Sequence, residues 1–501
     1  MRLLNDMRFL DTLTGQFVEK NPMETLYAML SHTSDRERGE QTYEQLKRIQ
    51  KRYAPKRQAR SNTPPPHTPS PLDPMPPMIS RILGRLWRFV PFAIFTPSIW
   101  DDPRLSPKIR MACALALQTG YRYIWIDFCC IDKTSSIEFG TAVNSMYPLY
   151  RQAGICFAYL ADVDSADAPS AKESPFGQSR WHTCGWTLPE LIVPGDVQFL
   201  SKDWKFIGSK RALAGVLEDV TGISRDAFLN RIALNRFSVA QRFSWAASRY
   251  TERVEDQAYS LVGLFQVYME TRYGEGERAF LHLQEEIVRR IPDSSLFAWD
   301  LALLNSDVLE ELDAAPRTPE DRRFTYNLSP DLDSLFLATS ASRFKEETAR
   351  EIVPVWHEVV CGRLRVPYFN QVPNESTGRD FQVQFPMIPL TAYVPPEAIR
   401  FSEDYPLSQW YLAILDCEHK RLPGHLLGRV CCILPSETGT YFVLPGHLDV
   451  LGSNTQSSEV SWSGLLPLSP AAIERCRSQI EVRALYVSCP VQGAQETESS
   501  H

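Results

Sequence analysis

The chain has 501 residues and a formal net charge of −7, from 60 acidic and 53 basic side chains. So modest a charge argues against a protein that binds nucleic acid over its whole surface. The length suffices for two or three domains, and an apolar content of 44% supports packed cores. Charges at Arg2, Asp6, Arg8 and Asp11 interrupt any secretory segment in Met1–Phe17. The eleven cysteines show neither a disulfide pattern nor zinc-ligand spacing, so we expect a cytoplasmic protein with reduced thiols and no metal.

The first predicted elements are two strands and a short helix. Met1–Phe17 is typical of a strand and a turn, and Leu26–Leu30 is typical of a buried strand. Ser31 and His32 follow directly after that second strand. Side chains just past the end of a parallel strand line the ligand crevices of α/β sheets. Glu40–Gln50 is predicted to be a helix.

The next stretch, about 51–106, interrupts the pattern of globular elements. Lys47–Arg60 is basic, which is typical of a solvated face or a nuclear-import signal. Arg60–Met78 is rich in proline, and we expect it to be extended and mobile. Ile79–Trp100 is apolar, but three arginines and two prolines interrupt it. Its longest uninterrupted apolar run is therefore too short to span a membrane. We interpret this stretch as an insertion with a surface or docking segment at its end, or as retained intron sequence.

The centre of the chain is predicted to form a β-α-β unit. Ser106–Gly120 has the cap, the early proline and the terminal glycine of a helix, with Leu117 on its inner face. Tyr123–Cys130 is a short run of β-branched and aromatic residues, which is typical of a strand buried on both faces. Asp127 and Asp132 stand at its carboxyl end, where open parallel sheets bind their ligands.

The helix of this unit is predicted to begin after Ser135. Ser135 and Glu138 have the spacing of a capping box. Cys156–Leu160 is predicted to return as the next strand through a right-handed crossover. The apolar stripe between them has helical spacing and consists of Phe139, Val143, Met146, Tyr150 and Ala153.

A second distinctive block, Trp181–Pro194, contains another helix signal. Thr187 and Glu190 have the spacing of a capping box, which predicts that the Glu190 carboxylate caps a helix. The further predicted elements are a strand at Val197–Leu200, a helix at Phe206–Thr221 and a helix capped by Ser238 and Gln241.

Beyond Trp299 the pattern changes to short alternating segments. Asp300–Thr325 is acidic and loop-like. No helical period runs through the rest, so we expect a mainly-β domain at 326–491, either a sandwich or an open barrel, and a disordered tail at 492–501. The predicted strands are Phe381–Met387, Trp410–Asp416, Leu427–Leu434, Tyr441–Leu444 and Gln479–Val487.

Several ordered blocks of the sequence resemble the heterokaryon-incompatibility (HET) domain of filamentous fungi. These blocks are WIDFCCIDKTSS, NSMYPLYRQAGICFAYLADV and SRWHTCGWTLPELIVP, with YAMLSHT upstream and SVAQRFSWAASRYTERVEDQAYSLVGLF and YGEGERAFLHLQEEI downstream. The resemblance implies a HET domain at 1–225, which contains the insertion, and a helical extension at 226–300 packed on it. It also implies an α/β fold with a parallel sheet, distantly similar to TIR and flavodoxin-like proteins.

The resemblance further implies a role in vegetative incompatibility, as an effector of self/non-self recognition and programmed cell death. Because some TIR domains cleave NAD with a pocket glutamate, it implies NAD as a substrate and Glu190 and Asp127 as catalytic carboxylates. It implies protein partners or self-association, and we expect no nucleic-acid partner and no bound cofactor. The candidate ligand-binding residues are Ser31, His32, Asp132, Trp181 and Trp186, whose indole rings suit stacking on a base.

The same residues also have purely structural interpretations. Glu190 is explained by its capping box, and Asp127 can cap the turn that follows it. The chain also departs from the family pattern, because Ser34 stands in place of tryptophan, Cys184 in place of arginine and Pro189 in place of glutamine. The alternative is therefore a degenerate, non-catalytic HET domain that serves as a protein-interaction module.

Overall fold

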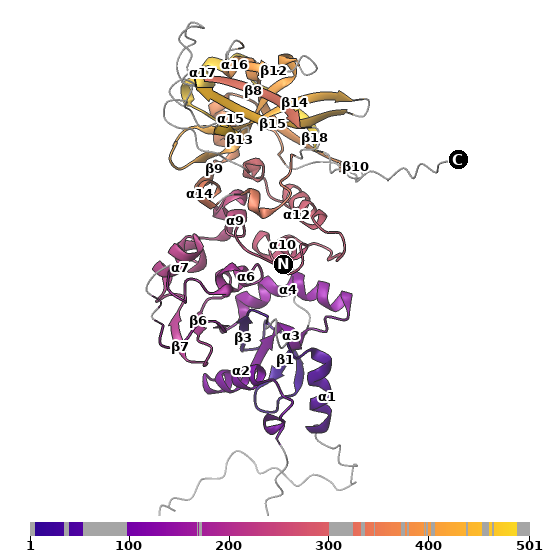
Figure 1. Ribbon diagram of the computed structural model, residues 1–501. Coiled ribbons are helices and arrows are strands. Elements are labelled where there is room, and N and C mark those ends of the chain that lie inside the picture. The colour runs from indigo at the N-terminus through magenta and orange to yellow at the C-terminus, as the bar shows by residue number, and fades with distance from the viewer. Residues whose placement is uncertain are drawn as a thin grey trace, which may run out of the picture.

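The protein is described by a computed structural model as three stacked layers (Figure 1). An N-terminal sheet with its helices lies at one end, a helical layer lies in the middle and a β-rich part lies at the other end. The described residues are 6–34, 40–53, 98–167, 169, 173–299, 324–331, 336–344, 346–371, 376–377, 380–394, 396, 399–401, 406–436, 439–452, 460–462 and 465–487.

Within the described residues, the N-terminal sheet has seven strands in the order β2-β1-β4-β3-β5-β6-β7. The central strands β4, β3, β5 and β6 are parallel, and β1, β2 and β7 are antiparallel additions at the two edges. The strands are β1 (Met7–Asp11), β2 (Phe17–Lys20), β3 (Tyr27–His32), β4 (Tyr123–Ile126), β5 (Ile155–Tyr159), β6 (Val197–Leu200) and β7 (Phe206–Ser209).

The strand register explains which side chains meet at the carboxyl edge of this sheet. β3 lies between β4 and β5, and Leu30 pairs with Ile126 while Ser31 pairs with Ala158. The residues that follow, Ser31 on β3 and Asp127 after β4, are therefore neighbours at one edge. The sheet thus places the two predicted clusters of polar residues together, as expected for parallel strands.

Helices cover this sheet and connect its strands. α2 packs on β4 and α6 packs on β3. α2 buries Ile109, Ala112, Cys113 and Ala116, but Leu117 is 42% exposed, so the predicted inner face is one residue too wide. The elements are α1 (Tyr43–Tyr53), η1 (Ile99–Asp101), α2 (Pro107–Gln118), α3 (Asp127–Cys130), α4 (Ser136–Gln152), α5 (Arg180–Thr183), α6 (Thr187–Ile192) and α7 (Ala214–Thr221).

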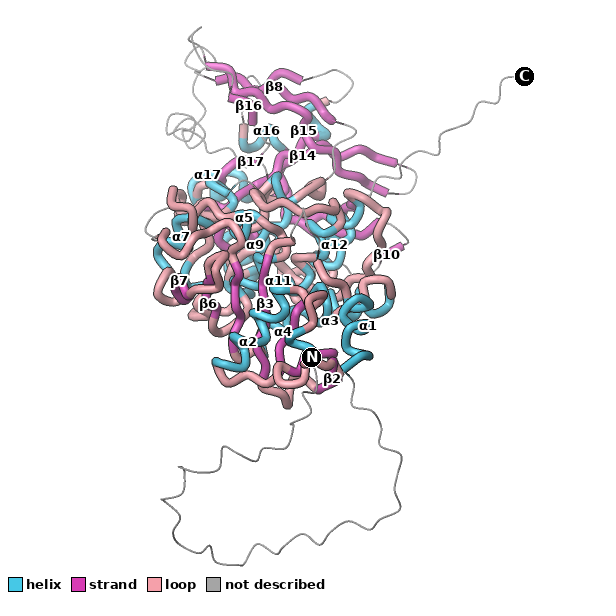
Figure 2. The backbone as a smooth tube through the Cα atoms, turned by 60° about the horizontal axis from the view of Figure 1, so that its bottom comes forward, coloured by secondary structure: helices cyan, strands magenta, loops and turns pink. Residues whose placement is uncertain are grey.

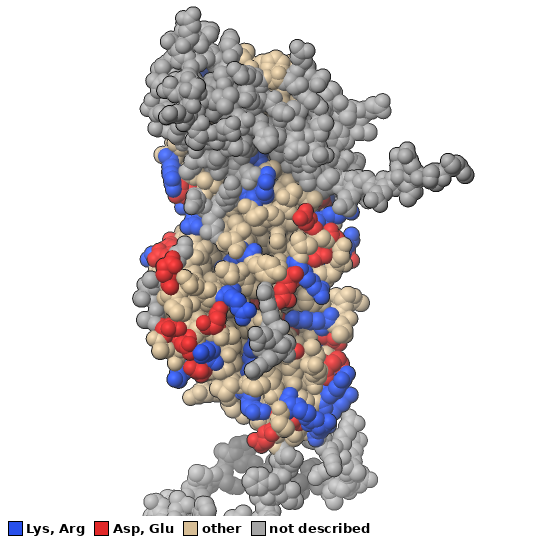
Figure 3. Space-filling view, viewed as in Figure 1, with Lys and Arg blue, Asp and Glu red and all other residues tan. Residues whose placement is uncertain are grey.

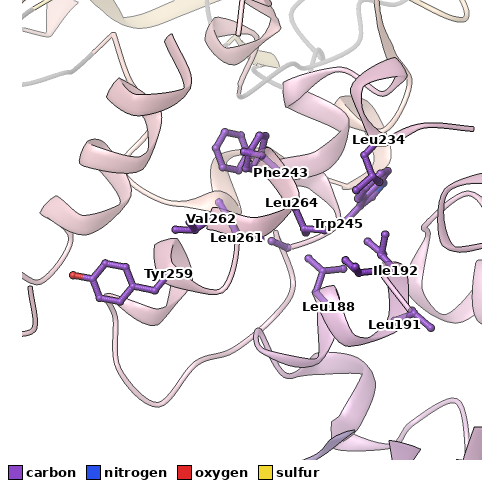
Figure 4. Packing of buried hydrophobic residues seen from close by; sticks show 14 of the residues in the cluster. Leu188, Leu191, Ile192, Leu234, Phe243, Trp245, Tyr259, Leu261, Val262 and Leu264 are labelled. Carbon is purple, nitrogen blue, oxygen red and sulfur yellow. The ribbon is translucent and has the colours of Figure 1, made fainter. Parts of the chain in front are cut away.

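The middle layer consists of short helices that pack on α4 and α6. Figure 4 shows Leu188 and Ile192 of α6 beside Trp245 and Leu264 in the buried cluster. The predicted capping box is confirmed, because Ser238 Oγ accepts from Gln241 N at 3.0 Å and Gln241 Oε1 accepts from Ser238 N at 2.9 Å. The elements are α8 (Arg225–Phe228), η2 (Leu234–Arg236), α9 (Val239–Ser244), α10 (Asp256–Tyr259), α11 (Val262–Phe265), α12 (Arg278–Val288) and η3 (Ser294–Phe297).

The C-terminal part is mainly β, as predicted, and its strands gather at the far end of the molecule (Figure 2). β14, β15, β18, β11 and β13 pair in a closed ring, which favours a barrel over a sandwich. The strands are β8 (Phe324–Asp331), β9 (Ile352–Pro354), β10 (Ser376–Thr377), β11 (Asp380–Pro389), β12 (Ile399–Phe401), β13 (Trp410–His419), β14 (Leu426–Ser436), β15 (Gly439–Gly452), β16 (Val460–Trp462), β17 (Leu465–Leu468) and β18 (Glu481–Val487). The helices are η5 (Ala341–Arg343), α14 (Glu346–Ala349), α15 (His357–Leu364), α16 (Leu390–Tyr393), η7 (Leu407–Gln409), α17 (Pro470–Cys476) and η8 (Arg477–Gln479).

One buried hydrophobic cluster runs through all three layers, from Phe9 to Val487. Buried polar contacts join the middle layer to the C-terminal part as well. Gln284 Nε2 donates to the Ala338 carbonyl at 2.7 Å, and the Ser238 hydroxyl donates to the Ile352 carbonyl at 2.8 Å. The layers are thus packed together through apolar and polar contacts, whereas the predicted domain boundaries stay a prediction.

Two local predictions are wrong, and a third is confirmed only in part. The strand predicted over Tyr123–Cys130 ends at Ile126, and Asp127–Cys130 forms α3, because a short buried apolar run does not distinguish strand from helix. Phe206–Thr221 is not one helix, since Phe206–Ser209 forms edge strand β7. The Ser135 capping box is half formed: Ser135 Oγ accepts from Glu138 N, but the Glu138 carboxylate accepts from Arg8 and Asp132 N instead.

The predicted insertion lies mostly outside the described residues, which omit 54–97. Its flanks meet, because the Tyr53 hydroxyl donates to Asp102 Oδ2 at 3.0 Å. Figure 3 shows acidic and basic side chains interspersed on the visible face, with basic ones gathered near α1. The acidic segment 300–323 and the predicted tail also lie outside the described residues. In the part of the chain that the structure describes, no helix is both long and apolar enough to cross a membrane.

Candidate functional site

Four side chains form a buried hydrogen-bonded group at the carboxyl end of the parallel strands. Ser31 comes from β3, Tyr150 from α4, Trp181 from α5 and Glu190 from α6. Trp181 Nε1 donates to Ser31 Oγ at 2.7 Å, and the Ser31 hydroxyl donates to Glu190 Oε2. The Tyr150 hydroxyl donates to Glu190 Oε1 at 2.5 Å. We call these four residues the inner group. Glu190 is 8% exposed, and the other three are still more deeply buried.

The predicted capping box of Thr187 and Glu190 is wrong. The Thr187 hydroxyl donates to the carbonyls of Trp181 and Cys184, and the N-cap residue of α6 is Trp186, whose side chain makes no cap bond. Every residue of α6 is buried, so the helix turns Glu190 toward the sheet rather than toward its own first turn. Helix capping therefore does not explain the Glu190 carboxyl group.

The environment of Glu190 favours its protonated form. Burial raises the pKa of Glu190, hydrogen bonds from Ser31 and Tyr150 lower it, and the nearby charge of Asp127 raises it again. The resulting pKa is about 7. Burial, followed by the Glu190 charge, raises the pKa of Tyr150 well above its usual value, so this hydroxyl remains a donor. Glu190 can therefore gain or lose a proton near neutral pH.

A second set of polar residues, His32, Asp127 and Lys133, lies beside the inner group; we call it the outer group. His32 Nε2 is 3.0 Å from Asp127 Oδ1, and Lys133 Nζ donates to Asp127 Oδ2 at 3.0 Å. Burial raises the pKa of Asp127, but the charge of Lys133 and the contact with His32 outweigh it, so that pKa is well below its usual range. The Asp127 side chain is 29% exposed, so the outer group holds an ionised carboxylate that solvent reaches.

His32 is fixed from several sides. Its Nδ1 lies 3.1 Å from the Thr33 carbonyl oxygen and 3.5 Å from Glu40 Oε1. Lys108 pairs with Glu40 and reaches within 3.4 Å of the same ring nitrogen. The Phe128 ring and the imidazole pack in a T-shaped arrangement, with centroids 4.9 Å apart. The ring thus has little freedom, and its Nε2 holds Asp127 in place.

Two of the predicted site residues, Asp132 and Trp186, belong to neither group. Asp132 accepts hydrogen bonds from the Thr134 backbone N–H and hydroxyl, so it stabilises the turn before α4. Trp186 hydrogen-bonds Asp256, which also accepts from the Tyr273 hydroxyl at 2.7 Å in the middle layer. The role of Asp132 and Trp186 in ligand binding stays a prediction. Trp181 is fully buried, so its visible role is to position Ser31.

Sequence reasoning missed Tyr150 and Lys133. Tyr150 belongs to the apolar stripe of α4 and was counted there as a core residue, although its hydroxyl contacts Glu190. A buried tyrosine usually finds a hydrogen-bond partner, which is the signal that could have identified it. Lys133 follows Asp132 in a turn, and no periodic pattern marks it.

A metal centre does not form among the described residues, where no three potential ligands come together. Cys129 is fully buried, and burial raises the pKa of its thiol well above the usual value, as expected for a core residue rather than a nucleophile. The chemistry available at this edge is therefore that of two carboxyl groups with opposite protonation preferences.

The comparisons with known proteins concern the family rather than the fold. Residues 96–188 match the family described as heterokaryon incompatibility protein (HET), in agreement with the resemblance noted in the sequence. Residues 278–491 match a family described as a domain of unknown function (DUF8212). The chain is also similar to the vegetative incompatibility protein HET-E-1 of Podospora anserina, with 43% identity over 185 residues. That match covers 36% of this chain and 14% of the relative, and no solved structure matches.

Proposed function

We propose that this protein acts in vegetative incompatibility and that its HET domain is the effector that kills or arrests the cell. The HET family match and the similarity to HET-E-1 support the first statement. The second rests on the position of the inner and outer groups at the carboxyl edge of the parallel sheet, where α/β proteins bind ligands. The whole protein's activity is thus assigned to its N-terminal part.

The proposed reaction is hydrolysis of the N-glycosidic bond of NAD. The bond between ribose and nicotinamide breaks, nicotinamide leaves as a neutral molecule with the bonding electron pair, and a water adds to the ribose and gives up a proton. Such cleavage has an oxocarbenium-like transition state, which an adjacent carboxylate stabilises. Asp127 suits that role because it stays ionised and partly exposed. Glu190 suits the transfer of a proton because its pKa is about 7. A pair of carboxyl groups whose environments drive their pKa values apart is the single observation that carries this proposal. A distant similarity to TIR domains would agree with it.

The same geometry supports a proposed order of events. A substrate meets Asp127 first, because Glu190 is 8% exposed and both its oxygens accept hydrogen bonds. Glu190 can act only when Ser31 or Tyr150 releases it. We therefore propose that the described arrangement is a resting form and that a trigger or self-association opens the inner group.

The test is the cellular NAD level after induction of the full chain in a fungal host. Wild type should deplete NAD, whereas Asp127→Asn and Glu190→Gln should not. The matched control is Asp102→Asn, which alters a buried, arginine-paired carboxylate outside the inner and outer groups and should deplete NAD normally. The NAD level is compared only for variants whose protein accumulates to the wild-type level. If Asp127→Asn depletes NAD like wild type, the proposed reaction is wrong.

A non-catalytic interaction module is the second candidate. The buried cluster that runs from the N-terminal sheet into the C-terminal part favours it, since a partner bound at one end can act on the other through packed contacts. In that case cells die after induction while NAD stays constant, and both carboxyl variants still kill.

A further inference from the structure

A pair of stacked aromatic rings lies next to the outer group at the carboxyl edge of the parallel strands. Tyr159 is the last residue of β5, and Trp204 lies in the turn between β6 and β7. Their ring centroids are 4.4 Å apart, and the ring planes are inclined by 22°. We call these two residues the ring pair. Both are only partly buried, so the ring pair meets solvent.

The backbone at Trp204 is held in a conformation that favours glycine. Its φ is 61°, and its N–H donates to the Ser201 carbonyl at 2.9 Å to close the turn. Among the described residues, the other non-glycine residues with positive φ are Asn230, Gln266 and Arg365, none of which is aromatic. A bulky side chain in this conformation is strained, and such strain concentrates at functional sites. Because glycine would suit the turn better, the turn itself does not explain the indole.

Several contacts fix the ring pair beside His32. Tyr159 pairs with His32 in the register of β5 and β3, so the two residues are neighbours on adjacent strands. Lys108 Nζ lies 3.4 Å from His32 Nδ1 and 5.7 Å from the centroid of the Tyr159 ring, so it bridges the outer group and the ring pair. The Tyr159 hydroxyl donates to the Lys202 carbonyl at 3.1 Å, which ties this ring to the turn that carries Trp204.

The ring pair offers aromatic surface rather than free charge. Lys202 is paired with a carboxylate at 2.6 Å, and Lys108 is paired with Glu40. Asp203, which precedes the indole in the chain, is exposed. A base that stacks on an aromatic side chain is held through its π-face, which every base has. Binding of a flat ring here therefore requires no unpaired cation.

We propose that the ring pair stacks on the adenine ring of the dinucleotide substrate, an assignment that rests on the proposed function. The bond between ribose and nicotinamide must lie against Asp127, because that carboxylate stabilises the charge that develops when the bond breaks. His32 and Lys108 stand between Asp127 and the ring pair. The ring pair therefore receives the end of the substrate that is remote from the reaction. Because it meets solvent in the described arrangement, adenine binds there without opening of the inner group.

The test measures binding of adenosine monophosphate (AMP) and of ribose 5-phosphate, which lacks the base, to the full chain by NMR titration. The wild type should bind AMP about tenfold or more tightly than ribose 5-phosphate, because only AMP carries a ring that stacks. Trp204→Leu and Trp204→Gly should each weaken AMP binding by about tenfold, whereas Trp204→Phe, which keeps an aromatic ring, should weaken it by less than about threefold. Glycine adopts a positive φ without strain, so Trp204→Gly removes the ring and keeps the turn.

Trp356→Leu is the matched control, because Trp356 is 66% exposed and precedes α15 in the C-terminal part. It should bind AMP like wild type. If the wild type does not bind AMP, if it binds ribose 5-phosphate as tightly, or if Trp204→Leu and Trp204→Gly bind AMP as tightly as Trp204→Phe, the proposal is wrong. If Trp204→Leu weakens binding of nicotinamide mononucleotide and leaves AMP binding unchanged, the assignment to adenine is wrong.

The binding test is independent of the cellular NAD test. Loss of AMP binding in the ring-free variants supports the ring pair even if NAD stays constant after induction, and in that case only the proposed reaction fails. Depletion of NAD by a wild type that does not bind AMP has the opposite meaning, since the reaction then stands and the ring pair does not hold the base.

Discussion

The inner and outer groups lie side by side, and yet they shift the pKa of a carboxyl group in opposite directions. Glu190 is surrounded by uncharged donors and apolar side chains, so burial dominates and its pKa rises to about 7. The Asp127 side chain is 29% exposed, and Lys133 and His32 outweigh the effect of its partial burial, so its pKa falls well below the usual range. The comparison teaches that burial alone does not decide protonation, because the charge of the partners decides its sign.

The largest expected effect is on the free energy of unfolding, which should fall more when the Glu190 carboxyl group is removed than when the Asp127 carboxylate is removed. Glu190→Ala leaves the buried hydroxyls of Ser31 and Tyr150 without their acceptor and creates a cavity, so the free energy of unfolding should fall by about 3–5 kcal/mol. Asp127→Ala removes a partly exposed carboxylate and should cost about 1–2 kcal/mol. Urea unfolding of the full chain measures both. Equal losses would contradict the distinction between the groups.

The pH dependence of stability sharpens the comparison. Because folding raises the pKa of Glu190 from 4.5 to about 7, the folded state binds the extra proton between these values. Its contribution to stability is complete below pH 4.5 and is lost as pH rises through 7, by about 3 kcal/mol. Asp127 has the opposite sign, since its lowered pKa gives stability that is lost as the solution becomes acidic.

Glu190→Gln cannot titrate, so it removes the Glu190 contribution alone. The free energy of unfolding of the wild type should fall between about pH 5 and 7, and this fall should be smaller in Glu190→Gln. The control variant Asp102→Asn, which changes another buried carboxyl group, should show the same fall as the wild type. Identical pH profiles for wild type and Glu190→Gln would show that Glu190 titrates near its ordinary value.

Ser31→Ala tests the link between Trp181 and Glu190. It removes the acceptor of the buried Trp181 N–H and one donor to Glu190, and it should destabilise the protein by about 1–3 kcal/mol. It should also raise the pKa of Glu190 further, because the hydrogen bond from Ser31 lowers it. Thermal unfolding over a pH series measures both effects. A lower pKa of Glu190 in Ser31→Ala than in the wild type would contradict the described geometry.

The smallest effect is expected at the exposed end of the outer group. The Lys133 side chain is 49% exposed, so Lys133→Gln should change the free energy of unfolding by less than about 1 kcal/mol. The same change removes the largest influence that lowers the pKa of Asp127, so stability should be lost at a higher pH on acidification. Acid titration of the variant beside wild type checks this shift.

The sequence was sufficient to place the strands that carry the site. Buried parallel strands are nearly continuous apolar runs, so Leu26–Leu30 and Cys156–Leu160 were recognisable, and the polar residues at their ends followed. The capping box at Glu190 was predicted wrongly because the spacing Thr-x-x-Glu fits one, whereas the choice between cap and sheet depends on tertiary burial of α6. The contact between Tyr150 and Glu190 joins residues 40 positions apart, which no local pattern reveals.

The most direct test of the central claim is a carboxyl ¹³C NMR titration of Glu190 and Asp127 in the full chain, with resonances assigned by Glu190→Gln and Asp127→Asn. We predict that the Glu190 signal shifts with a midpoint near pH 7. The Asp127 carboxyl group should stay ionised at pH values below the usual pKa range of aspartate. If both signals titrate together near pH 4, the two groups do not differ, and the proposed division of roles between them is wrong.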